Sequence, residues 1–307
     1  MTARLNFIIL FASLPILWGC LWLASHSSWW VALVAAWIFS LVNMLPFALM
    51  HEAVHGVGAT SKKTNYLLGL FGGLVFGTSI SMQTVAHLGH HQRNRTDAEL
   101  YDYYLPYQSK VMRNFWLFAG NLFGLYWFCI PFSNAIFLMS PWIYRSKLFA
   151  KKLAPALGFG PYIDDLVRLP IGRVWVEVVL VFIYHIGIFL LIDLTWQGWL
   201  ICYWLFALHW SALQYVDHAW SARDTINGAW NLKVSKISSL LALNYHYHLT
   251  HHQHPNMPWN KLPELAGHAR GPSFWSIYFS LWRGVKPAPP MGSPANYSLF
   301  SSTYQPR

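Results

Sequence analysis

Nine of the fifteen histidines occur in three short motifs and one separate position, with spacings typical of metal ligands. The motifs are HEAVH, HLGHH and HLTHH, and the separate histidine ends the sequence QYVDH. The residues concerned are His51, His55, His87, His90, His91, His218, His248, His251 and His252. Imidazole is a good ligand for Zn, Fe, Cu and Ni. The sequence therefore predicts a metal site that is built mainly from histidine.

HEAVH on its own is compatible with several kinds of protein. Its two histidines are four residues apart, so on a helix they lie on one face and can bind the same metal. HExxH is also the signature of zinc metalloproteases, in which the glutamate, here Glu52, acts as a general base. From this motif alone a protease, another metal enzyme and a chance occurrence all stay open.

HLGHH and HLTHH change this interpretation. Each places histidines at positions i, i+3 and i+4, so one helix face again presents several imidazoles. A catalytic zinc site needs only three protein ligands and a water molecule. Eight histidines in three motifs are too many for one ion, and the sequence favours two metals.

The composition indicates the environment in which this site forms. Hydrophobic residues make up 55% of the chain and charged residues 10%, and the mean hydropathy is positive. Soluble domains contain roughly 25% charged residues, so we expect a membrane protein. The three cysteines lie in apolar runs and indicate neither a disulfide framework nor a cysteine-based zinc site.

Four uncharged or nearly uncharged runs have about the 20 residues that a membrane-spanning helix needs. They are residues 5–24, 29–50, 174–192 and 199–216, and they form two hairpins with short tips. None of the 21 Lys and Arg residues lies in a tip. Because basic residues accumulate on the cytoplasmic side, we expect both hairpins to enter an inner or cytoplasmic membrane from the cytoplasm. Glu177 is expected at the membrane interface.

Two further apolar stretches, 66–79 and 115–139, complicate the topology. A shared metal site requires that neither crosses the membrane once, and the first is short for a span. We predict an all-α integral membrane protein with four transmembrane helices in two hairpins, interfacial helices and a cytoplasmic histidine-rich cap that holds two metals. One domain is expected over residues 1–287, followed by a mobile tail over 288–307.

The order HxxxH, HxxHH, a long membrane insertion and HxxHH resembles the membrane fatty acid desaturase and hydroxylase superfamily. The likeness covers about residues 45–263, and HEAVHG and NYHYHLTHHQHPNMPWNKLP are similar to bacterial acyl-lipid desaturases and carotenoid ketolases. This resemblance implies two Fe ions held by the nine histidines, with O2 as co-substrate. It also implies that His218 is an additional ligand and that Gln214 stands where acyl-coenzyme A desaturases carry Asn.

Polar residues near the motifs are candidates for orienting the ligands through hydrogen bonds. They are Gln214, Glu52, Asp97, Asp217, Asp224 and Asn244. Arg93 and Arg95 follow HLGHH directly. Either they bind an anionic head group or an electron-donor protein, or they belong to a solvated basic turn.

We expect an O2-dependent oxidoreductase that acts on a long apolar chain, most simply a fatty acyl lipid desaturase. Hydroxylases, ketolases and oxidative decarboxylases of fatty acids, alkanes or carotenoids would carry the same motifs. More distant alternatives are an intramembrane zinc protease and a non-enzymatic haem or metal carrier. Because no HPGG segment of cytochrome b5 type is present, electrons are expected from a separate ferredoxin, rubredoxin or cytochrome b5. Dispersed basic residues without a binding motif do not indicate nucleic-acid binding.

Overall fold

Helices form nearly all of the regular structure in the computed structural model, which describes residues 2–156, 160–267 and 271–299. The chain divides into two compact units, each made of two separate stretches of sequence. The first unit contains Met1–His90 and Phe128–Tyr203, and the second contains His91–Trp127 and Trp204–Arg307. The sequence predicted one domain over 1–287. It stays a prediction, because discontinuous units such as these can belong to one domain.

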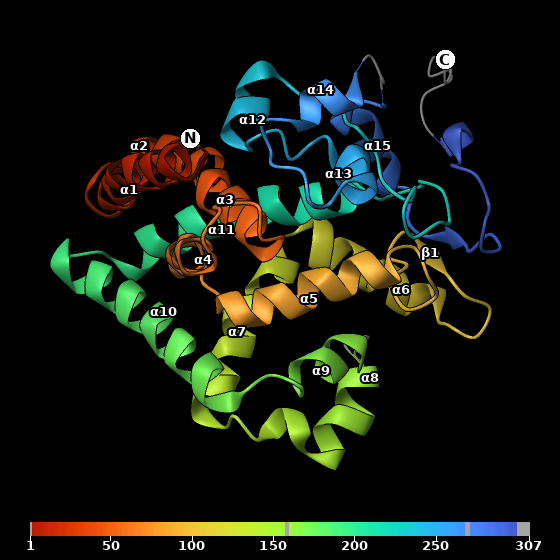
Figure 1. Cartoon of the computed structure of the whole chain (residues 1–307), viewed down its shortest axis with the longest axis horizontal. Helices are drawn as coiled ribbons and strands as arrows, with labels where there is room; N and C mark the ends of the chain where they lie inside the picture. Colours follow the sequence, from red (N-terminus) through yellow and green to blue (C-terminus); the bar gives the residue numbers. More distant parts are fainter. Residues whose placement is uncertain (1, 157–159, 268–270, 300–307) are drawn as a thin grey trace. The chain divides into compact units, whose positions relative to one another are not determined.

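The first unit is built from long helices and a group of short ones. Its N-terminal helices are α1 (Thr2–His26), α2 (Trp29–Val42), α3 (Met44–Val54), α4 (Lys62–Phe76) and α5 (Ile80–Arg93). Its second stretch carries most of α7 (Leu125–Met139), η2 (Ile143–Arg145), η3 (Phe149–Leu153), α8 (Ala154–Ala156), α9 (Gly160–Leu166), α10 (Ile171–Leu191) and the start of α11 (Trp196–Val216). In Figure 1, α1 and α2 lie side by side as the predicted first hairpin.

The second unit has shorter elements and longer loops. They are β1 (Tyr103–Tyr104), α6 (Lys110–Trp116), η1 (Leu117–Leu122), α12 (Lys236–Leu241), α13 (His248–Gln253), α14 (Leu262–Ala266), α15 (Phe274–Leu281), β2 (Lys286–Pro287) and η4 (Tyr297–Leu299). The strands β1 and β2 form one parallel pair, with Tyr103 opposite Lys286. The third histidine motif lies on α13, which is labelled in Figure 1 together with α12, α14 and α15.

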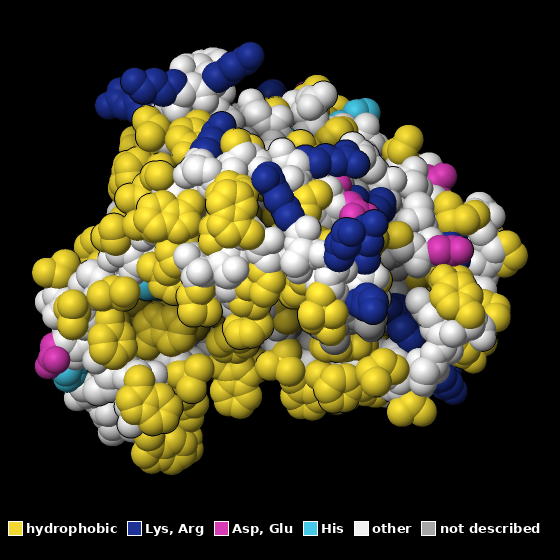
Figure 2. All heavy atoms as spheres, turned by 90° about the horizontal axis from the view of Figure 1, so that it is seen from below, with side chains coloured by type: hydrophobic (Ala, Val, Ile, Leu, Met, Phe, Trp, Pro, Cys, Tyr) yellow, Lys and Arg dark blue, Asp and Glu magenta, His cyan; other side chains and the backbone are white. Residues whose placement is uncertain are grey.

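Three of the four predicted spans are helices long and apolar enough to cross a membrane. In the described part of the chain they are Ala3–His26, Trp29–Val54 and Ile171–Leu191. The fourth predicted span lies on α11, which has 21 residues. It is not one of these three, and it contains polar residues such as Gln197, His209 and Gln214. Trp30, Trp37 and Leu191 are among the large apolar side chains that are exposed. Figure 2 shows one face of the molecule, much of it covered by hydrophobic side chains in yellow.

The two stretches that complicated the topology are not straight helices. Residues 66–79 lie on α4 and the turn before α5, and these two helices are bent by 95°. Residues 115–139 lie on a second pair, Lys110–Leu122 and Leu125–Met139, bent by 84°. Such bends are compatible with a broken span or with a re-entrant segment.

Glycines on α4 allow this helix to approach the histidine-bearing α3 closely. A Cβ atom on Gly72 would lie 2.7 Å from the Pro46 carbonyl oxygen and 3.0 Å from the Met50 Cβ, both on α3. A Cβ on Gly69 would lie 2.9 Å from the Ala53 Cβ. The glycine-rich stretch therefore serves the packing of α4 against α3, the helix that carries His51.

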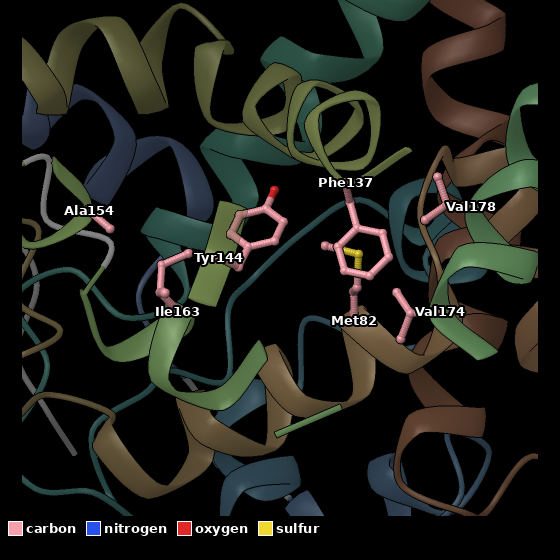
Figure 3. Close-up of a cluster of buried hydrophobic side chains, with 7 residues drawn as sticks. All are labelled: Met82, Phe137, Tyr144, Ala154, Ile163, Val174 and Val178. Carbon is pink, nitrogen blue, oxygen red and sulfur yellow. The ribbon is translucent and has the colours of Figure 1, made fainter. Parts of the chain in front are cut away.

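A buried apolar cluster joins α5 to the second stretch of the same unit. It consists of Met82, Phe137, Tyr144, Ala154, Ile163, Val174 and Val178. Figure 3 shows Phe137 beside Met82, with Val174 and Val178 next to this pair. Burying such side chains contributes about 1.5–3 kcal/mol each. The packing holds the start of α5 against α10.

The residues predicted to begin a mobile tail make backbone hydrogen bonds within the second unit. Ala288 N–H donates to the Tyr104 carbonyl, Gly292 N–H to Arg223, and Asn296 N–H to Trp220. The Pro and Ser content that suggested mobility does not prevent such bonds to neighbouring loops. Residues 300–307 of the predicted tail lie outside the described residues.

Candidate metal centre

The first unit brings together histidines from the first two motifs. His51 lies in the last turn of α3 and His55 directly after that helix, while His87 lies on α5. Ring nitrogens of these three residues lie within 4.8 Å of one another. The Nε2 atoms of His55 and His87 are 2.9 Å apart. The His90 ring, also on α5, lies 5.8 Å from that of His87.

The second unit has a cluster of its own around α13. Ring nitrogens of His218, His248 and His252 lie within 4.8 Å of one another. The His248 Nε2 atom is 3.0 Å from that of His218 and 3.3 Å from that of His252. The His91 Nε2 atom is 3.1 Å from that of His251, and the His91 ring stacks on His252. Each of the nine predicted ligands thus has another imidazole near it within its own unit.

One hydrogen bond determines which nitrogen of His218 faces this cluster. Its Nδ1 atom is 2.7 Å from the carbonyl oxygen of Gly228, so this nitrogen carries the proton and donates. The Nε2 lone pair is then directed toward His248. Metal-binding histidines usually have their second ring nitrogen fixed in this way.

The spacing of the ring nitrogens fits a transition metal. Two nitrogens bound at about 2.1 Å are about 3.0 Å apart at a right angle and about 3.4 Å apart in a tetrahedral arrangement. The separations found within the two units, from 2.9 to 3.3 Å, fall in this range. An all-imidazole donor set suits Fe, Zn, Cu or Ni rather than Mg or Ca.

Burial favours the form of imidazole that can bind a metal. Desolvation, together with the nearby His90, lowers the pKa of His55 from 6.5 to about 4. Because a protonated ring nitrogen cannot act as a ligand, His55 is ready for metal binding at neutral pH. His51, His248 and His251 are also buried.

The predicted orienting residues occupy different positions. Glu52 is buried on α3 beside His51, and its backbone carbonyl accepts hydrogen bonds from Val57 and Gly58. Gln214 accepts a hydrogen bond of 3.0 Å from the Tyr245 hydroxyl, and the Tyr245 ring lies 4.8 Å from that of His248. Gln214 therefore reaches the third motif through Tyr245.

Asp217, next to His218, is fully buried. Among the described residues neither of its carboxylate oxygens has a hydrogen-bond partner, and burial raises the pKa of this carboxyl well above its usual value. Its backbone carbonyl accepts from Trp230 N–H. Asp217 is therefore a buried acid at the edge of the cluster in the second unit.

The other three candidates support loops. Asp97 forms an ion pair of 2.7 Å with Arg223. Asp224 accepts from the backbone N–H groups of Ile226 and Asn227, which shapes the turn leading to Gly228. Asn244 accepts from the Ser239 hydroxyl and has a φ of 61°, a backbone conformation that Asn tolerates well.

Arg95 fits neither interpretation that the sequence offered. Its side chain is 2% exposed and binds Asp102 through two hydrogen bonds of 2.7 and 3.0 Å. Asp102 in turn accepts from Trp220 N–H. Arg95 thus connects the loops that follow HLGHH and His218. It is neutralised by Asp102, seven residues along the chain, in a pairing that no motif marks. Arg93 pairs with Glu99 at 3.0 Å.

Asn231 is a site residue that sequence reasoning missed. Its amide accepts a hydrogen bond from Thr250 N–H and donates one to the Thr250 hydroxyl, at 3.0 and 2.9 Å. Thr250 stands between His248 and His251 on α13. No spacing signal marks Asn231, since it fixes the helix through its backbone rather than through a histidine.

Comparison with known proteins adds one match. A family model described as "Fatty acid desaturase" matches residues 4–279. This range contains all nine histidines and both units' clusters. A search of curated proteins finds no match.

Proposed function

Because this chain belongs to the fatty acid desaturase family, we propose that it is an O2-dependent membrane oxidoreductase that inserts a double bond into a long fatty acyl chain. The proposed cofactor is a pair of non-haem Fe ions. The proposed ligands are His51, His55, His87, His90, His91, His218, His248, His251 and His252. The observation that carries the proposal is the pair of imidazole clusters, one in each unit, within the range of the family match.

The number of the clusters supports two metals rather than one. His51, His55 and His87 group in the first unit, and His218, His248 and His252 in the second. His90 lies near His87 in the first unit, and His91 lies near His251 and His252 in the second. A zinc protease that used HEAVH with Glu52 as base would leave the histidines of the second unit without a role.

The reaction balances with O2 and two electrons from outside the chain. A –CH2–CH2– unit, O2, two electrons and two protons give –CH=CH– and two water molecules. Iron bound by the histidines would supply the one-electron and O2 chemistry that amino acid side chains lack. The electrons are proposed to come from a separate donor of the ferredoxin, rubredoxin or cytochrome b5 type.

The side chains themselves supply orientation, charge state and protection from water. The Gly228 carbonyl holds the His218 ring in one tautomer, and Asn231 fixes α13 through Thr250. Burial keeps His55 neutral. It also limits the access of water to His248, His251 and His252, which are at most 5% exposed. Excluding water strengthens electrostatic interactions in the site and suppresses side reactions.

The setting of the site supports an apolar substrate taken from the membrane. Three long apolar helices carry exposed tryptophans and aliphatic side chains. We propose that the site faces the cytoplasm, because the basic residues lie outside the hairpin tips.

Lipid analysis of expressing cells tests the proposed activity. The wild-type chain is expected to produce acyl chains that have lost two hydrogen atoms, whereas His251→Ala produces none. His26→Ala is the matched control, since His26 is exposed and bonded to the Asp193 carbonyl. If the acyl chains instead gain one oxygen atom and no new double bond, the activity is that of a hydroxylase and not that of a desaturase. No change in any acyl chain would contradict the proposal.

A further inference from the structure

We infer that Glu177 on α10 is a positioning residue that fixes the start of α5 and thereby the imidazoles of His87 and His90. The inference rests on the proposed function in one respect, namely that these imidazoles bind metal. Glu177 lies in a helix apolar enough to span a membrane, yet it is 1% exposed. An ionisable group in such a helix marks function by default, because burying it is costly.

The carboxylate of Glu177 is fully engaged by neighbours in the same unit. Its Oε2 atom accepts from the Ser79 hydroxyl at 2.6 Å and from Ser81 N–H at 2.9 Å. Its Oε1 atom accepts from the Ser81 hydroxyl at 2.8 Å and from the Tyr66 hydroxyl at 2.9 Å. Arg173 donates at 3.2 Å from one turn earlier on α10 and lies over the Tyr66 ring.

These donors belong to the corner between α4 and α5. Tyr66 is on α4, Ser79 ends the connecting turn, and Ser81 is in the first turn of α5. The Ser79 hydroxyl also accepts from Met82 N–H at 3.2 Å, so it caps α5 while it donates to Glu177. A carboxylate at a helix N-terminus is stabilised by the unpaired N–H groups and by the helix dipole.

Fixing the first turn of α5 also fixes the imidazoles further along it. His87 lies about 10 Å along the axis from Ile80, at about 1.5 Å per residue. A rotation or shift at the start is passed along the rigid helix to His87 and His90. The start of α5 is held relative to α4, because Tyr66 on α4 donates to the same carboxylate. The glycines of α4 in turn pack closely against α3, which carries the first histidine motif. Glu177 therefore sets the second histidine motif relative to the first.

The negative charge is needed because every contact to Glu177 is a donated hydrogen bond. In Glu177→Gln an NH2 group replaces one acceptor oxygen. The hydroxyls of Ser79, Ser81 and Tyr66 can reorient, but two other donors cannot. If the NH2 group takes the Oε2 position, Ser81 N–H loses its acceptor, and if it takes the Oε1 position, Arg173 Nε–H loses its acceptor. Glu177→Gln therefore keeps the shape of the side chain but removes its ability to accept all of these hydrogen bonds.

Hydrogen exchange of the metal-free protein in detergent tests the inference without relying on metal. Glu177→Gln is expected to raise exchange in residues 80–90 by about tenfold or more, as expected for losing one charge-assisted hydrogen bond, and to leave α1 unchanged. Asp164→Asn is the control, since Asp164 is exposed on α9 of the same unit. Tyr66→Phe, which loses one donor and keeps the carboxylate, should give a smaller rise. Unchanged exchange in residues 80–90, or a uniform rise that includes α1, would overturn the inference.

Iron titration of the same variants separates this inference from the proposed function. We expect Glu177→Gln to lose at least half of the iron that the wild-type chain retains after dialysis, whereas Asp164→Asn retains all of it. Wild-type retention in Glu177→Gln would contradict the inference and leave the proposed function intact. No iron in the wild-type chain would contradict the proposed function, and the hydrogen exchange result would then still decide the role of Glu177.

Discussion

At the scale of single residues, burial determines what the histidines and charged groups of this chain can do. Imidazoles that are withdrawn from water stay neutral, which is the form that binds metals. Buried charges persist where a partner is fixed nearby, as for Arg95 with Asp102 and for Glu177 with its donors.

His246 should make the metal-free protein sensitive to acid. Burial lowers its pKa from 6.5 to about 4. Below pH 6.5 the unfolded chain binds a proton that the folded chain does not, so the free energy of unfolding falls as the pH is lowered toward 4. The full effect is about 3 kcal/mol, because a pKa difference of one between the two states corresponds to about 1.36 kcal/mol. Thermal melting of wild type and His246→Asn at pH 7 and pH 5 measures it.

A smaller loss of stability at pH 5 in His246→Asn than in wild type is the expected result. His26→Asn serves as the control because His26 is exposed. Equal losses in wild type and His246→Asn would show that His246 does not contribute to the acid sensitivity.

The buried pair Arg95 and Asp102 should be far more important for stability than an exposed pair. Removing one partner of a buried ion pair leaves an uncompensated charge and costs about 3–5 kcal/mol. Asp102→Asn is therefore expected to lower the melting temperature strongly. Glu264→Gln should have almost no effect, because its pair with Lys261 is exposed and such pairs contribute at most about 1 kcal/mol. Similar melting temperatures for the two variants would contradict this ranking.

At the scale of helices, close packing of α3 and α4 places the first histidine motif. A side chain at Gly72 would meet the backbone of α3, which cannot move aside as a flexible side chain could. Both the glycine stretch and the motif could be read from the sequence. Their relation could not, because it depends on which face of α4 meets α3.

Gly72→Ala should therefore destabilise the protein and weaken metal retention. Overpacking of this kind costs about 1–3 kcal/mol. Gly19→Ala on α1 is the matched control, since a Cβ there meets nothing within 4 Å and alanine favours helix formation. The melting temperature should fall in Gly72→Ala and stay equal or rise in Gly19→Ala. A fall of similar size in both variants would show that the close approach to α3 is not the cause.

The sequence predicted helix positions better than the contacts between them. Three of the four predicted spans are helices apolar enough to cross a membrane, since length and hydropathy are local properties. The pairing of His51 with His55 also follows from their four-residue spacing, whereas their approach to His87 joins residues of different helices. The role of Asn231 and the engagement of Glu177 depend on partners 19 and about 100 residues away in the chain, and the burial of Arg95 on an acid in an irregular loop. Such contacts leave no periodic signal in a single sequence.

At the scale of the whole molecule, each unit is assembled from two distant stretches of chain and contributes its own histidines. The first unit supplies His51, His55, His87 and His90, and the second supplies His91, His218, His248, His251 and His252. Neither set reaches nine ligands alone. The proposed ligands of the metal pair come from both units, and all of them lie within the family match over residues 4–279.

Metal content of the purified wild-type protein tests the central claim most directly. We expect two Fe per chain, no Soret absorption from haem, and less than two Fe in His218→Ala, whereas His26→Ala keeps both. His218 is the sharpest choice because the Gly228 carbonyl directs its Nε2 atom toward His248. A single zinc ion per chain, or full iron retention in His218→Ala, would contradict the proposal of a di-iron oxidoreductase held by nine histidines.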